Sequence, residues 1–207
     1  MEKHIIFNIG RQFGSGGKSI ANRIGQVLGI PVYDGEILSE AARQSGISPE
    51  FFEKQDEKRR SWGIGSIFGA NRYASGYSTG SGINDAELFR IQSETIREIA
   101  SRGNAIFVGR ASDYVLRDLD CCVDVFICAP VEARVERIRE RLGIDSDEKA
   151  AALIEKRDKG RAEYYNFFTQ GHWGKSSGYD ICIDSSILGI EGTADLIIDF
   201  AKRSGKL

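Results

Sequence analysis

Five short apolar segments along the chain predict the strands of one sheet. They cover residues 4–10, 31–34, 105–109, 122–129 and 179–184. Several of them are apolar at consecutive positions, which is typical of strands that are buried on both faces. Helical patterns separate most of the segments, and strands that alternate with helices form parallel sheets covered by helices. The pattern therefore predicts an α/β fold.

Helices are predicted where apolar residues recur every three or four positions. The clearest helical segments are residues 18–28, 85–101, 131–142 and 146–169. The chain between the second and third strands differs, because residues 49–60 are charged and helical and residues 62–82 are rich in glycine and serine. Long segments of this kind usually bind a ligand or move, so we expect an inserted mobile lobe over residues 36–84. A disordered surface insertion is the alternative.

The length and the charge balance narrow the class of protein. The 207 residues fit a single domain, residues 1–207, that can bury most of its apolar surface without disulfides. Its 28 basic and 30 acidic residues are mixed along the chain and give a formal charge of −2, which predicts no broad surface for nucleic acid. No signal-like start and no apolar run of about 20 residues is present, so we expect a cytoplasmic protein without a membrane segment.

The four cysteines predict neither a zinc site nor a disulfide. They lie in or beside apolar segments and lack paired C-x-x-C spacing: Cys121, Cys122, Cys128 and Cys182. We expect all four to be reduced thiols buried in the core.

A glycine-rich segment directly after the first strand carries the clearest chemistry. It reads GSGGKS and consists of Gly14, Ser15, Gly16, Gly17, Lys18 and Ser19. Glycines let successive backbone N–H groups converge on anionic oxygens, and the N-terminus of the following helix adds partial positive charge. Lys18 can then reach the β- and γ-phosphates of ATP, and the Ser19 hydroxyl can ligate Mg²⁺. We call residues 14–19 the phosphate loop.

The match to the phosphate-loop consensus G-x-x-x-x-G-K-[ST] is incomplete. The consensus places its first glycine at position 12, where this chain has Gln12, and Gly10 lies two residues earlier. The alternative is a glycine-rich turn without a ligand.

Four motifs together resemble a known family. They are the phosphate loop, YDGEIL at residues 33–38, FVGR at residues 107–110 and KRDKGR at residues 156–161. With them the chain resembles the cytidylate kinase-like group of P-loop nucleoside monophosphate kinases. The tyrosine pair at 164–165 and GHWGKSSGYD at residues 171–180 resemble a divergent branch of that group.

The resemblance implies a fold and a reaction. The fold is the three-layer P-loop NTP hydrolase type, with five parallel strands in the order 2-3-1-4-5, an inserted lobe like the nucleoside monophosphate-binding lobe, and an arginine-bearing lid over residues 143–170. The reaction is transfer of phosphate from ATP, with Mg²⁺, to a nucleotide or other small-molecule acceptor.

This chain departs from authentic cytidylate kinases at residues that grip the acceptor in that group. Those enzymes have an acid directly after the arginine of the FVGR-like motif, where this chain has Ala111, and the nearest carboxylate is Asp113. An aspartate and an arginine of their lid correspond here to Arg161 and Tyr164. Phosphate transfer from ATP is therefore better supported than the use of CMP as the acceptor.

Three arginines are candidate catalytic residues. Phosphoryl transfer spreads charge over oxygens and needs positioned cations more than a strong base. Arg157 and Arg161 fall on the apolar stripe of the helix over residues 146–169, and local pairing with Asp158 or Glu163 is the alternative. Arg110 ends the third strand, at the edge of the sheet where ligands bind, and is our candidate for holding the acceptor phosphate; a structural salt bridge is the alternative.

Two further residues have two interpretations each. Asp34 ends the second strand, where it could orient the acceptor or hold the water molecules of Mg²⁺, or instead cap the helix that begins near Glu36. Trp173 lies in a turn before the last strand, where it could stack on adenine or pack in the core.

The residues leave two classes of function open. The first is an ATP-dependent phosphotransferase acting on a nucleoside monophosphate or a related small molecule. The second is a non-catalytic ATP-binding regulator that has lost the acceptor site. The sequence does not predict an oligomeric state.

Overall fold

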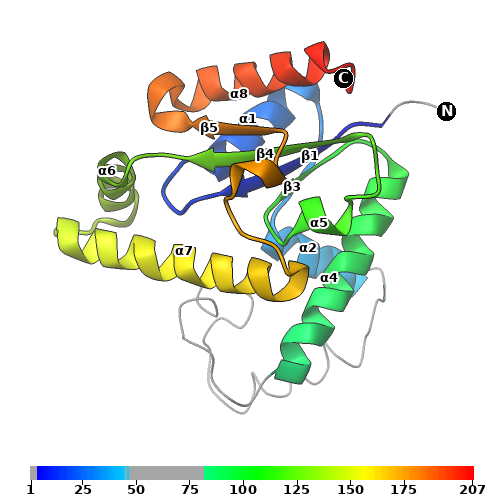
Figure 1. The fold of residues 1–207 in the computed structure, drawn as a ribbon, viewed down its shortest axis with the longest axis horizontal. Coiled ribbons are helices and arrows are strands. Elements are labelled where there is room, and N and C mark those ends of the chain that lie inside the picture. Colours follow the sequence, from blue (N-terminus) through cyan, green and yellow to red (C-terminus); the bar gives the residue numbers. More distant parts are fainter. Residues whose placement is uncertain (1–3, 45, 47–81) are drawn as a thin grey trace.

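The computed structural model describes residues 4–44, 46 and 82–207 (Figure 1). The predicted charged helix over residues 49–60, and the glycine- and serine-rich segment up to residue 81, lie outside the described residues. The extent of the inserted lobe therefore remains a prediction.

The five strands form one parallel sheet in the order β2-β3-β1-β4-β5, which confirms the expected α/β fold and order 2-3-1-4-5. The strands are β1 (Ile6–Arg11), β2 (Val32–Tyr33), β3 (Ala105–Val108), β4 (Cys122–Cys128) and β5 (Ile181–Asp184). Parallel neighbours require long crossover connections, which the helices supply. Since β1 is the central strand of the sheet, the loop that follows it lies in the middle of the side where the carboxyl ends of the strands meet.

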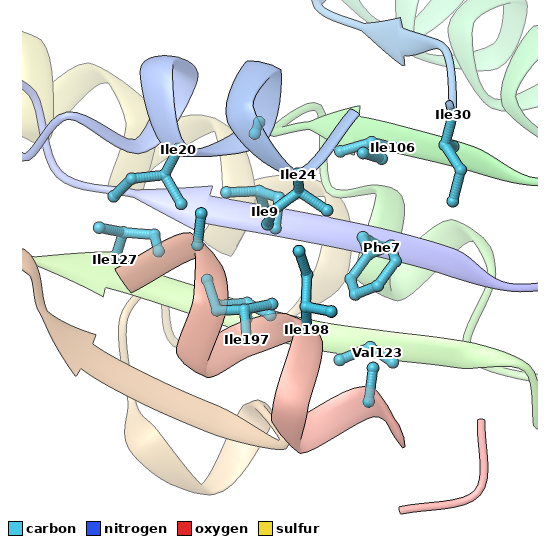
Figure 2. Packing of buried hydrophobic residues seen from close by; sticks show 14 of the residues in the cluster. Phe7, Ile9, Ile20, Ile24, Ile30, Ile106, Val123, Ile127, Ile197 and Ile198 are labelled. Atoms are coloured by element: carbon cyan, nitrogen blue, oxygen red, sulfur yellow. The ribbon is translucent and has the colours of Figure 1, made fainter. Parts of the chain in front are cut away.

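Two helices cover one face of the sheet (Figure 1): α1 (Gly17–Leu28) and α8 (Ser185–Arg203). Alternate residues of a strand point to opposite faces. Phe7 and Ile9 of β1 accordingly pack in the same cluster as Ile24 of α1 and Ile197 of α8, with all four side chains fully buried (Figure 2). This packing fixes the start of α1 against the end of β1.

The opposite face is covered by α2 (Gly35–Gln44), α4 (Gly82–Arg102) and the short α5 (Ser112–Val115). Leu38 of α2 and Ile96 of α4 are fully buried with Phe107 of β3. The first helix of the expected insertion therefore packs on the core of the domain.

The remaining long helices, α6 (Val131–Leu142) and α7 (Asp147–Thr169), pack on each other beside one end of the sheet (Figure 1). They share a separate apolar cluster that includes Ile138 and Ile154, and Phe13 packs against this cluster. A single turn, η2 (Ser176–Gly178), follows α7. The helix pair is thus attached to the sheet partly through the chain that leads into the phosphate loop.

The cysteines are all free, as expected, but only Cys122 is fully buried, whereas Cys121 and Cys128 are partly exposed and Cys182 is exposed. Cys122 is buried, and burial raises the pKa of its thiol to about 12. Cys182 is exposed, so the prediction of its burial was wrong. It lies on β5, which is an edge strand of the sheet, while its neighbour Ile183 takes the buried position. Among the described helices, none combines the length and the apolar character needed to span a membrane.

Candidate active site

The phosphate loop connects the end of β1 to the first turn of α1. Gly14 and Gly16 have φ values of +83° and +81°, a left-handed conformation that side chains disfavour. A Cβ at Gly16 would also lie 2.5 Å from Ile190 of α8. Helix α1 has no side-chain cap and no acidic residue in its first turn. Its N-terminal N–H groups and positive end are therefore suited to an anion.

Gln12, which replaces the consensus glycine, fastens the loop to the sheet. Its side-chain Oε1 accepts a hydrogen bond from the backbone N–H of Ala129 at 3.1 Å, beyond the end of β4. Its own carbonyl accepts a hydrogen bond from the Ser15 hydroxyl at 2.9 Å. The side-chain bond to Ala129 is a contact that a glycine could not make.

Side chains from three helices also hold the loop. Arg137 of α6 donates to the Gly14 carbonyl at 2.6 Å, and Ser185 of α8 donates to the Ser15 carbonyl at 2.5 Å. Asp158 of α7 accepts a hydrogen bond from the Phe13 N–H at 2.6 Å. The loop is therefore anchored from several sides by side chains distant in the sequence.

Asp158 is a junction between α7, α6 and the loop. Its Oδ2 lies 2.6 Å from Nη1 of Arg134, whose side chain is only 8% exposed, and its Oδ1 lies 3.6 Å from Nη1 of Arg161. Burial raises the pKa of Asp158, and the donors from Phe13, Arg161 and Arg134 partly offset this. These donors favour the charged carboxylate, which links three separate elements.

Lys18 of the phosphate loop forms an ion pair with Asp34, with 2.6 Å between Nζ and Oδ2. The other oxygen of Asp34 accepts from the backbone N–H groups of Glu36 and Ile37 at 3.0 and 3.1 Å, so Asp34 does cap α2. Burial favours a higher pKa for Asp34, but the bonds from Lys18 and the backbone outweigh it and lower the pKa. The Lys18 side chain is 62% exposed, and Ser19 beside it is exposed as well.

The three candidate arginines line a single pocket beside the phosphate loop. A fourth arginine, Arg11, lines it too, and we call this cavity the arginine pocket. Its lining comprises Gly10, Arg11, Phe13, Gly35, Gly109, Arg110, Ala111, Ser112, Asp113, Arg157, Arg161, Tyr164, Tyr165, Trp173 and Tyr179. Residues from β1, the turn after β3, α2, α5, α7 and the turn before β5 thus meet at one place.

Arg161 lies in the pocket and also contacts Asp158. Its Nη1 donates to the carbonyl of Arg11 at 3.1 Å. Burial lowers the pKa of Arg161 to about 10; Asp158 opposes this shift, whereas Arg157 and Arg110 add to it. Pairing with Asp158, the alternative interpretation, therefore occurs without removing Arg161 from the pocket.

The backbone at Arg110 has an unusual left-handed conformation. Gly109, Arg110 and Ala111 have φ values of +75°, +64° and +53°, three left-handed residues in succession. Such residues are strained in non-glycine positions and cluster at functional sites. The guanidinium packs against Gly35, where a Cβ would lie 2.2 Å from Arg110 Nη2. Arg110 is therefore held beside the residue that follows Asp34.

Another wall of the pocket is aromatic and contains a partly buried carboxylate, Asp113. Tyr165 donates to Asp113 Oδ2 at 2.7 Å. Burial raises the pKa of Asp113 to about 6, which the Tyr165 bond opposes and the charge of Asp124 reinforces. Trp173 is half-buried and packs edge-on against Phe126, with ring centroids 5.3 Å apart. Trp173 thus both packs on a core residue and lines the pocket.

The raised pKa of Asp113 leads to a prediction about the free energy of unfolding. In the unfolded chain this carboxyl has an ordinary pKa near 3.8, whereas the folded value is about 6. The folded state therefore binds the proton more tightly, and stability falls as the pH rises through this interval. Asp113→Asn, which keeps an acceptor for Tyr165, should raise the free energy of unfolding at pH 7 by at most about 3 kcal/mol.

The measurement is urea unfolding of both proteins at pH 4 and pH 7. The increase in the free energy of unfolding of Asp113→Asn over wild type should be present at pH 7. It should shrink at pH 4, where the wild-type carboxyl is neutral. Asp120→Asn, at an exposed carboxylate in the turn before β4, is the control. An equal gain at both pH values would contradict the assignment.

Arg11 is an arginine of this pocket that was not among the predicted site residues. It is the last residue of β1, at the carboxyl edge of the sheet. A basic residue at that edge was the available signal, since ligands of open α/β sheets bind there. In the described part of the chain, no group of three histidine, cysteine, aspartate or glutamate residues is arranged to hold a metal ion.

Comparisons with known proteins identify the family and the fold. Residues 6–187 match the sequence model of the cytidylate kinase-like family. A cytidylate kinase from Methanopyrus kandleri is 28% identical over 191 residues, which cover 88% of this chain and 85% of the relative.

Solved structures also share the fold. An uncharacterized protein from Eubacterium ventriosum superposes with a TM-score of 0.73 at 27% identity, covering 96% of this chain and 98% of the other. A shikimate kinase from Bacteroides thetaiotaomicron has a TM-score of 0.53 at 12% identity over 96% of this chain and 98% of its own, a likeness in fold alone.

Proposed function

Because the chain belongs to the cytidylate kinase-like family, we propose that it is an ATP-dependent phosphotransferase that acts on a nucleoside monophosphate, of cytidylate type, or on a related small molecule. The observation that carries the proposal is the position of the arginine pocket directly beside the phosphate loop. Lys18 pairs with Asp34, and the next residue, Gly35, contacts Arg110 in that pocket. A site for phosphates and a site for a second anion are thus neighbours.

The residues of the phosphate loop fit the phosphates of ATP. The uncapped N-terminus of α1 and the left-handed glycines offer backbone N–H groups, and Lys18 is exposed enough to turn toward a ligand. The Ser19 hydroxyl would hold Mg²⁺, which usually keeps water and phosphate as its other ligands and needs no protein cluster. When bound, Mg·ATP supplies the phosphoryl group and the metal's charge.

The chain's own residues would position the two substrates and neutralise the negative charge of their phosphates. Planar guanidinium groups can each donate two parallel hydrogen bonds to a phosphate, which suits Arg110, Arg157 and Arg161 to the oxygens of the acceptor and of the transferred group. Asp34, held in place by the backbone of α2, would orient the acceptor side of the loop. Residues 143–170 would act as the lid, and closure would exclude water and suppress hydrolysis of ATP.

A non-catalytic ATP-binding regulator is the second candidate. The observation that favours it is Ala111, which stands where the family's acid contacts the acceptor. The arginine pocket favours the phosphotransferase, because four guanidinium groups around one cavity suit a second anion.

The experiment that tests the proposal is an acceptor screen. The protein is incubated with Mg·ATP and a panel of nucleoside monophosphates, small alcohols and small phosphates, and ADP release is followed. Acceleration by one acceptor is the expected result. Tight ATP binding with no turnover on any acceptor would favour the regulator.

Lysine substitutions test the lid arginines. Arg157→Lys and Arg161→Lys keep the charge but lose the planar fork, so each should lower kcat more than it raises the KM for ATP. Steady-state kinetics with the best acceptor measure this effect.

The control and a second readout separate this role from local pairing. Arg141→Lys is the matched control, because Arg141 also contacts the Phe13 ring, at 5.3 Å, but is exposed and does not line the pocket. Hydrogen exchange over residues 146–169 should slow when ATP and acceptor are added. Normal kinetics in both variants together with unchanged exchange would remove the lid from the proposal.

A further inference from the structure

The Arg11 side chain lies in a narrow space beside two glycines, which have no side chains to fill it. A Cβ at Gly17, at the start of α1, would lie 2.6 Å from the Cβ of Arg11. A Cβ at Gly109, after β3, would lie 1.7 Å from Arg11 Nη1. Side chains at these two positions would collide with Arg11, so the backbone on both sides is shaped around it.

The Arg11 guanidinium lies among like charges. Burial lowers its pKa well below the ordinary value, and the charges of Arg161 and Arg110 lower it further. Asp34 and Asp158 offset this only in part. Asp34 already pairs with Lys18, and Asp158 with Arg134.

No group in the described part of the chain forms a hydrogen bond or an ion pair with this guanidinium, although the Arg11 carbonyl accepts a bond from Arg161. Arg11 is partly exposed where it lines the arginine pocket, and a guanidinium that lies among like charges without a partner attracts an anion. An anion in this pocket would supply the missing partner.

We propose that Arg11 binds an oxyanion in the arginine pocket, namely the phosphate group of the acceptor nucleotide. The identity of this ligand as an acceptor rests on the proposed function; the binding of a phosphate oxyanion does not. The pocket is lined by Gly35, Arg110 and Asp113 and by none of residues 14–19, which places it on the acceptor side of the loop.

Arg11 differs from the lid arginines in being fixed. It belongs to β1, where it lies opposite Ile127 of β4 in the sheet, whereas Arg161 belongs to α7. A phosphate held by Arg11 would thus have a stationary partner while the lid closes. Arg161 donates to the Arg11 carbonyl and lines the same pocket, so both guanidinium groups could contact one ligand.

The proposal predicts effects of opposite sign on stability and on binding. Arg11→Met keeps the apolar stem and removes an uncompensated charge, so the ligand-free protein should have a higher Tm. The same variant should bind inorganic phosphate and the preferred nucleoside monophosphate roughly ten- to a hundredfold more weakly, because a charge-assisted bond is lost. A residue with only a structural role would lower the Tm when removed.

The experiment uses calorimetric titration and thermal unfolding of the full chain. The probes are inorganic phosphate, the nucleoside monophosphate panel and Mg·AMP-PNP. Arg11→Met should leave the affinity for Mg·AMP-PNP within about twofold of wild type. Arg11→Lys, which retains the charge, should show weaker phosphate binding without the rise in Tm, and it serves if the methionine variant fails to fold. Arg141→Met is the control and should change neither property.

Several outcomes would overturn the proposal. Wild-type affinity for phosphate and for nucleoside monophosphates in Arg11→Met would remove the role, and so would absence of phosphate binding by the wild type. Selective loss of Mg·AMP-PNP binding would assign Arg11 to ATP instead. If the wild-type protein binds inorganic phosphate through Arg11 but transfers no phosphoryl group from ATP to any acceptor, the proposed function fails and the oxyanion site stands.

Discussion

Replacing Lys18 with alanine should lower phosphate transfer about 10²- to 10³-fold and leave the fold intact. The loss would arise because Lys18 is the cation at the end of the phosphate loop, where negative charge would develop during the proposed transfer. Stability should fall only modestly, since the Lys18 side chain is 62% exposed and Asp34, which is 13% exposed, keeps its hydrogen bonds from the backbone N–H groups of Glu36 and Ile37. ADP release in the presence of the best acceptor measures the effect.

Lys202→Ala is the matched control for charge, because Lys202 is an exposed lysine on α8, outside the phosphate loop and the proposed lid. It should retain wild-type turnover. Circular dichroism and the unfolding midpoint establish that the Lys18 variant is folded. Unchanged ADP release by a folded Lys18→Ala protein would refute the role of Lys18.

Asp158→Ala should have the largest effect on stability, about 3–5 kcal/mol. The Arg134 side chain is 8% exposed and that of Asp158 is 16% exposed, so removal of the carboxylate leaves a buried guanidinium without its partner. The variant also loses the acceptor for the Phe13 N–H, which loosens the entry to the phosphate loop. Asp158→Asn keeps an acceptor oxygen and should lose less. Urea unfolding measures both variants.

Asp147→Ala provides the comparison. Asp147 begins the same helix and lies 2.6 Å from Nη1 of Arg139, but the two side chains are 66% and 42% exposed. An exposed pair of this kind contributes only about 0–1 kcal/mol. The prediction fails if the loss in Asp158→Ala is no greater than the loss in Asp147→Ala.

Most of the architecture could be predicted from local patterns. All five strands and the helices α1, α4, α6 and α7 lie within a few residues of the apolar segments that predict them, and the family resemblance supplies their order. Helix α8 was not predicted. Its apolar face is regular at Ile190, Ala194 and Ile197, but Gly189 has φ +65° within it and Gly192 weakens the helical pattern.

The candidate site could be predicted only in part. Arg110, Arg157 and Arg161 were identified from the ends of strands and the face of a helix, and they do line one pocket. The contacts that hold the loop join residues more than 100 positions apart, as in Gln12 with Ala129 and Phe13 with Asp158. No periodicity encodes such a contact, because it depends on how complete elements pack.

The anchoring of the phosphate loop has a consequence for the entropy of nucleotide binding. Contacts from Gln12, Asp158, Arg137 and Ser185 fix the loop before any ligand arrives. A nucleotide would then lose its own translational freedom but would not have to order the backbone that receives it, which otherwise costs about 1–2 kcal/mol for each residue fixed. The remaining conformational cost would fall on the lid, and because Asp158 belongs to α7, movement of the lid would be coupled to the position of the loop.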